Sequence, residues 1–272
     1  MSESIYRRIA LAEEENRPFW LVTVVATSGS TPATLGMKML VFGDGAFQGT
    51  VGGGTIENQV RSRVVAKKPR LPERWKFDME GDDDAAEKTG MECGGTQEML
   101  VEPLGPVWPL VIVGGGHCGM ALSALASRSG FSVTVLDDRP EWASKAKHPD
   151  ARVVTIPAYD RLAEQIEFGA DLFLVIMTHN HQYDELALRH LLGKEYRYLG
   201  MIGSDRKVDQ IMKRLRRGGF SQRELQRVYA PIGFAIGSHA PFEIAVSILA
   251  QMIAVRNGVS AVKMNSNPFS KK

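Results

Sequence analysis

Apolar and polar residues follow two different patterns along this chain, and the change falls near residue 106. Before it, apolar segments of strand length stand beside amphipathic segments of helix length. After it, strand-like and helix-like segments alternate regularly. Regular alternation of this kind predicts a parallel sheet with helices on both faces, the doubly wound arrangement.

The part before residue 106 predicts a mixed domain of helices and strands. Gly43-Asp44-Gly45 lies between two apolar segments and indicates a β-hairpin. We expect Ser28–Pro32 to break the first strand, because glycine, serine and proline favour turns. The expected helices are 4–16 and 55–66, and the expected strands are 19–26, 37–42, 46–51, 74–79 and 96–104.

A cluster of Pro103, Gly105, Pro106 and Pro109 suggests a domain boundary. We therefore expect an N-terminal domain over residues 1–106 and a C-terminal domain over residues 107–272. In the second, the expected strands are 110–113, 132–137, 152–156, 171–177 and 198–202, and the expected helices are 117–128, 159–168, 182–192, 205–217, 221–226 and 241–257. The fold class is α/β, with a C-terminal Rossmann-type doubly wound sheet beside an N-terminal α/β domain.

Composition narrows the range of partners. The net charge of +2 is too small to suggest a nucleic-acid partner, and we interpret the basic run Lys213–Arg217 as a solvated helix face. Two cysteines in 272 residues suggest no disulfide framework and fit a reducing cytoplasm. No apolar segment approaches the roughly 18 residues of a membrane span, and no signal peptide is recognisable. We expect a cytoplasmic protein with no membrane partner.

Gly114-Gly115-Gly116-His117-Cys118-Gly119 is the strongest motif, because it matches G-x-G-x-x-G between an apolar strand and a helix. In that motif Gly114 permits the tight turn, Gly116 lets a phosphate approach the backbone, and Gly119 lets helix and strand pack closely. Asp137 follows Gly119 by 18 residues, where an acid that binds a ribose hydroxyl is usual. An acid there favours NAD or a plain nucleotide over NADP. The alternative is a Rossmann fold that serves only as scaffold.

Two more glycine-rich segments lie in the N-terminal domain. Gly52-Gly53-Gly54 connects a strand to a helix and could form a second anion-binding nest, or be a flexible turn. Cys93 stands beside Gly94 and Gly95, where neighbouring N–H groups could favour the reactive thiolate. The alternative for Cys93 is a small buried apolar residue in a turn.

Thr178-His179-Asn180-His181 follows an apolar strand, at the end where open α/β sheets bind ligands. His179, His181 and the nearby Asp184 offer three possible metal ligands. We favour histidines that line a ligand site over a metal centre, and expect no metal site.

These segments, together with Ser28–Pro32, Gly49–Val51, Gly200–Ser204 and Pro231–Gly237, occur in the order seen in the XdhC/CoxI family, the xanthine dehydrogenase accessory factors. The resemblance spans nearly the whole chain. It implies a chaperone that binds the molybdenum cofactor in its molybdopterin form, assists its sulfuration with a cysteine desulfurase, and inserts it into a molybdenum hydroxylase of the xanthine dehydrogenase type. It also implies a homodimer, and favours a non-catalytic carrier over an enzyme.

The resemblance gives the motifs a common purpose. The loops Gly52–Gly54, Gly94–Gly95 and Gly114–Gly119 would hold phosphate groups, and Cys93 would contact the cofactor or assist sulfur transfer. The chain departs from the family at Asn180 and Ala235, where members often carry Asp. These departures weaken a metal-dependent hydrolase that uses His179, His181 and Asp184. A NAD-dependent oxidoreductase remains the main alternative, although the sequence lacks a Tyr-x-x-x-Lys pair for hydride-transfer chemistry.

Overall fold

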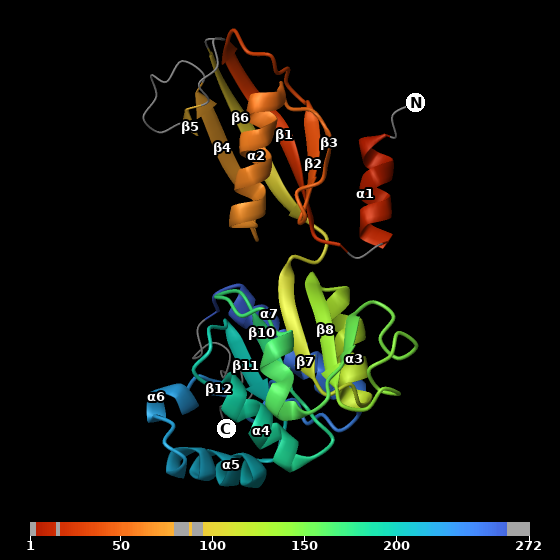
Figure 1. Cartoon of the computed structure of the whole chain (residues 1–272), viewed down its shortest axis with the longest axis vertical. Helices are drawn as coiled ribbons and strands as arrows, with labels where there is room; N and C mark the ends of the chain where they lie inside the picture. Colours follow the sequence, from red (N-terminus) through yellow and green to blue (C-terminus); the bar gives the residue numbers. More distant parts are fainter. Residues whose placement is uncertain (1–3, 15–16, 79–86, 89–94, 260–272) are drawn as a thin grey trace, which may run out of the picture. The chain divides into compact units, whose positions relative to one another are not determined.

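The structure, a computed structural model, describes residues 4–14, 17–78, 87–88 and 95–259. The chain divides into two compact units, Met1–Val107 and Trp108–Lys272 (Figure 1). The boundary expected from the proline cluster was between residues 106 and 107. Each unit is described by itself.

Unit 1 holds one six-stranded sheet and two helices (Figure 1). The strand order is β3-β2-β1-β6-β4-β5, and the pairs are antiparallel except for β4 with β5. The elements are α1 (Ile5–Glu14), β1 (Phe19–Gly29), β2 (Lys38–Phe42), β3 (Phe47–Gly49), α2 (Gly54–Lys67), β4 (Glu73–Asp78), β5 (Glu87–Lys88) and β6 (Gly95–Leu104).

Amphipathic spacing explains how the helices of unit 1 pack. Helix α1 places Ala12 in a buried cluster with Phe19, Leu40 and Phe42, as its apolar stripe predicted. Helix α2 buries residues four apart, namely Ile56, Val60 and Val64. Strand β6 alternates buried and half-buried positions, so one of its faces meets the core and the other does not.

Unit 2 is a Rossmann-type domain, and the α/β fold class expected from the sequence is confirmed (Figure 1). All five strand pairings are parallel, in the order β12-β11-β10-β7-β8-β9. With β7 counted as the first strand, this is the 3-2-1-4-5-6 order of dinucleotide-binding sheets. The elements are β7 (Trp108–Val113), α3 (His117–Ser127), β8 (Phe131–Asp137), β9 (Arg152–Thr155), the 3-10 helix η1 (Tyr159–Gln165), β10 (Phe173–Ile176), α4 (His181–Leu191), β11 (Tyr198–Met201), α5 (Asp205–Arg217), α6 (Gln222–Leu225), β12 (Val228–Tyr229) and α7 (Pro241–Arg256).

Helices cover both faces of the sheet in unit 2. Val111 and Val113 lie in the core cluster that includes residues from η1, α4 and α5. Ile112, between them, faces Gly119 of α3, which in turn packs on α7. Burial on both faces explains why these strands are continuously apolar instead of alternating.

The structure differs from the sequence-based expectations at several element ends. Strand β1 continues to Gly29 instead of ending at Ser28, because β6 pairs with it through Ser28 and Gly29 beyond an irregularity between Val24 and Ala26. Segment 159–168 is a shorter 3-10 helix, and the strand expected over 171–177 is confined to Phe173–Ile176. The two-residue strands β5 and β12 were missed, because so few residues carry no periodic signal.

Helix α7 bears on the expected homodimer. Ile248 and Met252, considered as interface residues because they form an apolar stripe, are fully buried inside unit 2. Gln251 beside them hydrogen-bonds the Tyr198 hydroxyl at 2.6 Å and the Gly233 backbone N–H at 3.0 Å. This face of α7 therefore belongs to the core, and the homodimer stays a prediction without these two residues.

Candidate functional site

The loop between β7 and α3 has the backbone geometry of a phosphate-binding turn. Gly114 has φ +115°, and a Cβ there would lie 2.2 Å from the Met177 carbonyl oxygen. A Cβ on Gly119 would lie 2.2 Å from the Gly114 carbonyl oxygen. A Cβ on Gly116 would meet nothing within 4 Å. Two of the three glycines are thus required by packing, and the third leaves open space where a phosphate would approach.

The N-terminus of α3 faces that open space. Gly116 caps the helix and has no side chain to accept from its first N–H groups. The first N–H that returns to the cap is that of Met120, at 2.8 Å from the Gly116 oxygen. Free N–H groups and the helix dipole favour an anion at this position.

Asp137 ends β8 as expected, but its carboxylate is fully occupied within the chain. One oxygen accepts the Gly115 N–H at 2.7 Å and Arg139 Nη2 at 2.9 Å. The other accepts the backbone N–H and Nε of Arg139, at 3.0 and 2.9 Å. Burial would raise the pKa of Asp137, but the hydrogen bonds from Arg139 and Gly115 outweigh it and hold the pKa below its usual value. Asp137 fixes the loop, and no part of its side chain is exposed.

The segment after β8 folds over the glycine loop and holds it in place. A Cβ on Gly115 would lie 2.9 Å from the Trp142 carbonyl oxygen and 3.1 Å from His148 Nε2. His148 is fully buried between the Ser123 hydroxyl at 3.1 Å and the Gly115 carbonyl oxygen at 3.2 Å. Burial lowers the pKa of His148, so the neutral imidazole is favoured. Arg139 and Lys147 lie over the Trp142 ring, at 5.3 and 4.3 Å from its centre.

A polar group from three segments gathers at the carboxyl ends of β8 and β10. Tyr159 of η1 donates its hydroxyl to Asp138 Oδ1 at 3.0 Å. His179 Nδ1 lies 3.8 Å from the same oxygen. Burial and the charges of Asp137 and Asp138 raise the pKa of Tyr159, so its phenol stays protonated and donates. Since β8 and β10 flank β7, the group stands where the strand order reverses, which is where open α/β sheets bind ligands.

His181, the second predicted histidine, does not join this group. Its side chain is 79% exposed, and its Nδ1 lies 4.0 Å from Asp184 Oδ2. Asp184 is buried and serves the loop instead: it accepts the Thr178 N–H at 2.9 Å and pairs with Lys207 Nζ at 2.5 Å. A metal site from His179, His181 and Asp184 therefore finds no support in the geometry, because Asp184 is already neutralised by a cation.

Asp137, Asp138 and His179 do bring three possible ligand atoms within 4.8 Å of one another. The described residues form no other such group. Arg139 already neutralises Asp137 and fills its acceptor positions, so a metal ion would have to displace a guanidinium. This arrangement suits an ion pair better than a cation site.

The glycine loop of unit 1 contains its own anion. Glu57, in the first turn of α2, accepts from the Thr50 hydroxyl at 2.5 Å and from the N–H groups of Val51 and Gly53, each at 3.4 Å. A Cβ on Gly52 would lie 2.7 Å from the Ala33 Cβ, whereas one on Gly54 would meet nothing within 4 Å. The structure thus explains Gly52 by packing and places a carboxylate at the predicted anion nest.

Cys93 and Gly94, predicted to contact the cofactor, lie outside the described residues. Gly95 is the first residue of β6, with φ +143°. A Cβ there would lie 2.5 Å from the Ser28 carbonyl oxygen, so the close approach of β1 explains this glycine. Gly95 is buried, and its assignment as a ligand contact stays a prediction.

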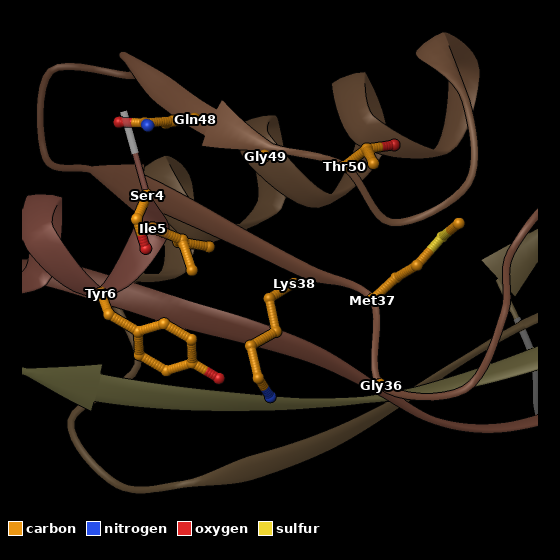
Figure 2. Close-up of a pocket in the computed structure, with 9 residues that line it drawn as sticks. All are labelled: Ser4, Ile5, Tyr6, Gly36, Met37, Lys38, Gln48, Gly49 and Thr50. Carbon is orange, nitrogen blue, oxygen red and sulfur yellow. The ribbon is translucent and has the colours of Figure 1, made fainter. Parts of the chain in front are cut away.

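A hollow of about 520 Å³ lies in unit 1 where α1 approaches β2 and β3 (Figure 2). Figure 2 shows Tyr6 of α1 and Lys38 of β2 on one side of it. Lys38, the single charged residue of this described lining, donates from Nζ to Thr23 Oγ1 at 3.1 Å. Thr50, at its edge, leads into the Gly52–Gly54 loop. The described residues that line the hollow include no group of catalytic or metal-binding side chains.

Sequence reasoning missed four residues of the site, namely Asp138, Arg139, His148 and Tyr159. Asp138 and Arg139 directly follow the predicted acid, so their position was a usable signal. His148 and Tyr159 are separated from the glycine loop by more than 28 residues, and no motif marks them. In the described part of the chain, no helix is both long and apolar enough to cross a membrane.

Comparison with known proteins places the chain among relatives with the same two parts. Residues 110–252 match the XdhC Rossmann domain, and residues 12–70 match the XdhC and CoxI family. The chain is 32% identical over 259 residues to the uncharacterized protein YqeB of Escherichia coli (strain K12), which covers 93% of this chain and 46% of that protein. It is 28% identical over 167 residues to a probable xanthine dehydrogenase subunit of Bacillus subtilis (strain 168), which covers 61% and 48%.

A solved structure agrees with these sequence matches. The crystal structure of a xanthine dehydrogenase from Bacillus halodurans is similar at a TM-score of 0.51 and 25% identity, over 96% of this chain and 98% of that one. The chain spans about half the length of the curated relatives it matches. The family expected from the motifs is confirmed: this chain belongs to the XdhC and CoxI family.

Proposed function

We propose that this chain binds the molybdenum cofactor and assists its sulfuration and insertion into a molybdenum hydroxylase of the xanthine dehydrogenase type. The observation that carries the proposal is the open space at Gly116, at the N-terminus of α3. Family membership supports the general role, since two relatives are named as xanthine dehydrogenase or as part of it.

The chemistry of the loop suits a phosphate group of that cofactor. The molybdopterin form is a pterin dithiolene that carries phosphate, and its nucleotide forms carry a second phosphate. The N–H groups of the first turn of α3 would bind the anion, while Arg139 and Lys147 supply positive charge beside the loop. His179, at the switch point of the sheet, would contact the ligand from the β10 side.

In this proposal the chain is a carrier more than an enzyme. A cysteine desulfurase would supply the sulfur, and the hydroxylase would receive the finished cofactor. Cys93, in its glycine-rich segment, would contact the cofactor or assist the sulfur transfer. We expect the carrier to act as a homodimer in the cytoplasm.

The test compares two glycine substitutions that both find open space. Gly116→Ala places a methyl group where the phosphate would approach, and the φ of −63° at Gly116 permits alanine. Gly169→Ala is the matched control, because a Cβ there also meets nothing within 4 Å and the residue lies outside the loop. We expect wild type and Gly169→Ala to bind molybdenum cofactor with equal stoichiometry, measured as molybdenum per chain after gel filtration, and Gly116→Ala to lose at least tenfold in affinity. Failure of the wild type to bind the cofactor contradicts the proposal.

Cys93→Ala separates cofactor binding from sulfur transfer. If Cys93 assists sulfuration, the variant should bind the cofactor but yield a hydroxylase with less activity when a cysteine desulfurase is supplied. Equal activation by the wild type and Cys93→Ala would remove Cys93 from the proposal and leave the glycine loop in place.

A NAD-dependent oxidoreductase is the second candidate. The 3-2-1-4-5-6 strand order and the acids at the end of β8 favour it, because both are typical of dinucleotide binding. Calorimetric titration with NAD and NADH discriminates the two, since micromolar binding together with turnover of a candidate substrate favours the oxidoreductase.

A further inference from the structure

Two consecutive acids end β8, and they have different surroundings. The four donors around Asp137 match the roughly four acceptor positions of one carboxylate. With no exposed surface and no acceptor position left, Asp137 would have to release Arg139 or the glycine loop before it could bind a ribose. The acid expected from the motif spacing is therefore a structural residue here.

Asp138 has the access that Asp137 lacks. Its side chain is 24% exposed. Its Oδ1 accepts from Tyr159, and no described residue donates a hydrogen bond to its Oδ2. One carboxylate oxygen is thus available to accept from a ligand.

The place of Asp138 in the fold fits that role. It follows β8, whose Leu136 carbonyl accepts the N–H of Gly114 in the loop at 2.8 Å. His179 approaches from β10, on the other side of β7. A nucleotide with a phosphate at the loop would place its ribose at the end of β8. We propose, building on the cofactor-binding function above, that Asp138 reads the ribose hydroxyls of the bound ligand and selects a nucleotide with a free 2′,3′-diol.

The surrounding charges act against a 2′-phosphate. Arg139, the nearest cation, is held bidentately by Asp137, and Lys147 lies on the face of Trp142. A phosphate on the ribose would meet the carboxylate of Asp138, while the Asp137 carboxylate already neutralises Arg139. Like charges this close disfavour binding, whereas hydroxyl donors satisfy the free oxygen.

The experiment measures the binding of two probes that differ by one phosphate. ADP-ribose and 2′-phospho-ADP-ribose are titrated into the full chain, with Trp142 fluorescence and calorimetry as readouts. Wild type should prefer ADP-ribose by at least about tenfold, the size of one charge-assisted hydrogen bond. Asp138→Asn should reduce this preference about tenfold, chiefly by weakening ADP-ribose. Asp209→Asn, an exposed acid of α5, is the matched control and should leave the preference unchanged.

The possible results separate this inference from the proposed function. Equal binding of the two probes by the wild type, or an unchanged preference in Asp138→Asn, overturns the role of Asp138. Binding of pyrophosphate and molybdenum cofactor without either ribose probe also overturns it, and leaves the loop intact as a phosphate site. A merely structural role for Asp138 would change the affinity for both probes equally, so the ratio of the two affinities decides.

Discussion

The backbone N–H of Gly115 donates a hydrogen bond to the carboxylate of Asp137 at 2.7 Å. A buried side chain at the end of β8 thus fixes the loop that begins α3, and Arg139 neutralises the charge that this requires. The same principle recurs in unit 1, where Glu57 accepts from the N–H groups of Val51 and Gly53. In both units a carboxylate from the chain itself organises a glycine-rich turn.

Asp137→Asn should destabilise unit 2. The side-chain amide would point N–H groups at donors and leave Arg139 unpaired, so we expect a loss of about 3 kcal/mol in the free energy of unfolding. Hydrogen exchange with mass spectrometry measures this in peptides from residues 110–140, which keeps the two units separate. Asp209→Asn should change the same peptides by less than about 0.5 kcal/mol, because its ion pair with Lys213 is exposed. Equal protection in the two variants would show that Asp137 does not organise the loop.

Gly119→Ala and Gly116→Ala should separate packing from ligand access. The methyl group at position 119 would meet the Gly114 carbonyl oxygen, so we expect a loss of about 3 kcal/mol or more in stability. At position 116 the methyl group has room, and an alanine cap should cost about 1 kcal/mol at most. Urea denaturation of the two variants, followed by circular dichroism, checks the order. Comparable losses would contradict the geometry of the loop.

His148 should make the stability of unit 2 depend on pH. Burial lowers its pKa below the usual 6.5, so the unfolded chain binds a proton more readily than the folded one. The contribution of neutral His148 is complete above pH 6.5 and should be lost as the pH falls from there through the lower folded-state pKa. Protection of peptides near residue 148, measured between about pH 7.5 and pH 5, should decline in the wild type.

A pair of variants attributes that pH dependence to one residue. His148→Gln should lower stability at neutral pH and flatten the slope, because no titrating group is left between Ser123 and Gly115. His181→Gln, whose exposed side chain lies outside this packing, should keep the slope of the wild type. A slope that survives in His148→Gln would assign the pH dependence to another group.

Glu57→Gln should loosen the glycine loop of unit 1. The neutral amide interacts less favourably with the N-terminus of α2, and we expect a loss of about 1 kcal/mol in peptides from residues 50–60. Glu13→Gln, an exposed residue near the end of α1, is the control. If Gly52–Gly54 also accepts an external anion, pyrophosphate should bind Glu57→Gln more tightly than the wild type, since the internal competitor is weakened. No gain in affinity would assign this loop a purely structural role.

Periodic segments made most of the fold predictable. Helix α5 covers the residues expected for it, Asp205–Arg217, because a strong apolar stripe and a serine cap mark its bounds. The Rossmann architecture followed from strand-helix alternation and from one glycine motif. Strand β1 was expected to end too early, because its last residues are held by pairing with β6, which is distant in sequence.

The candidate site was predictable only in part. The spacing from Gly119 located Asp137 at the end of β8, and the strand end located His179. Nothing in the sequence indicated that Arg139 would occupy Asp137, or that His181 would point to solvent while His179 approached Asp138.

The sequence by itself determined the elements, the two-part organisation, the family and the phosphate-binding turn, because these depend on periodicity and on short motifs. The tertiary structure decided which of two adjacent acids is buried and which is accessible, and which glycine leaves room for a ligand. The physical reason is that hydrogen-bond saturation and open space are properties of neighbours brought together by folding. Asp137 and Asp138 are chemically identical in the sequence, and their different roles arise from the donors that surround each carboxylate.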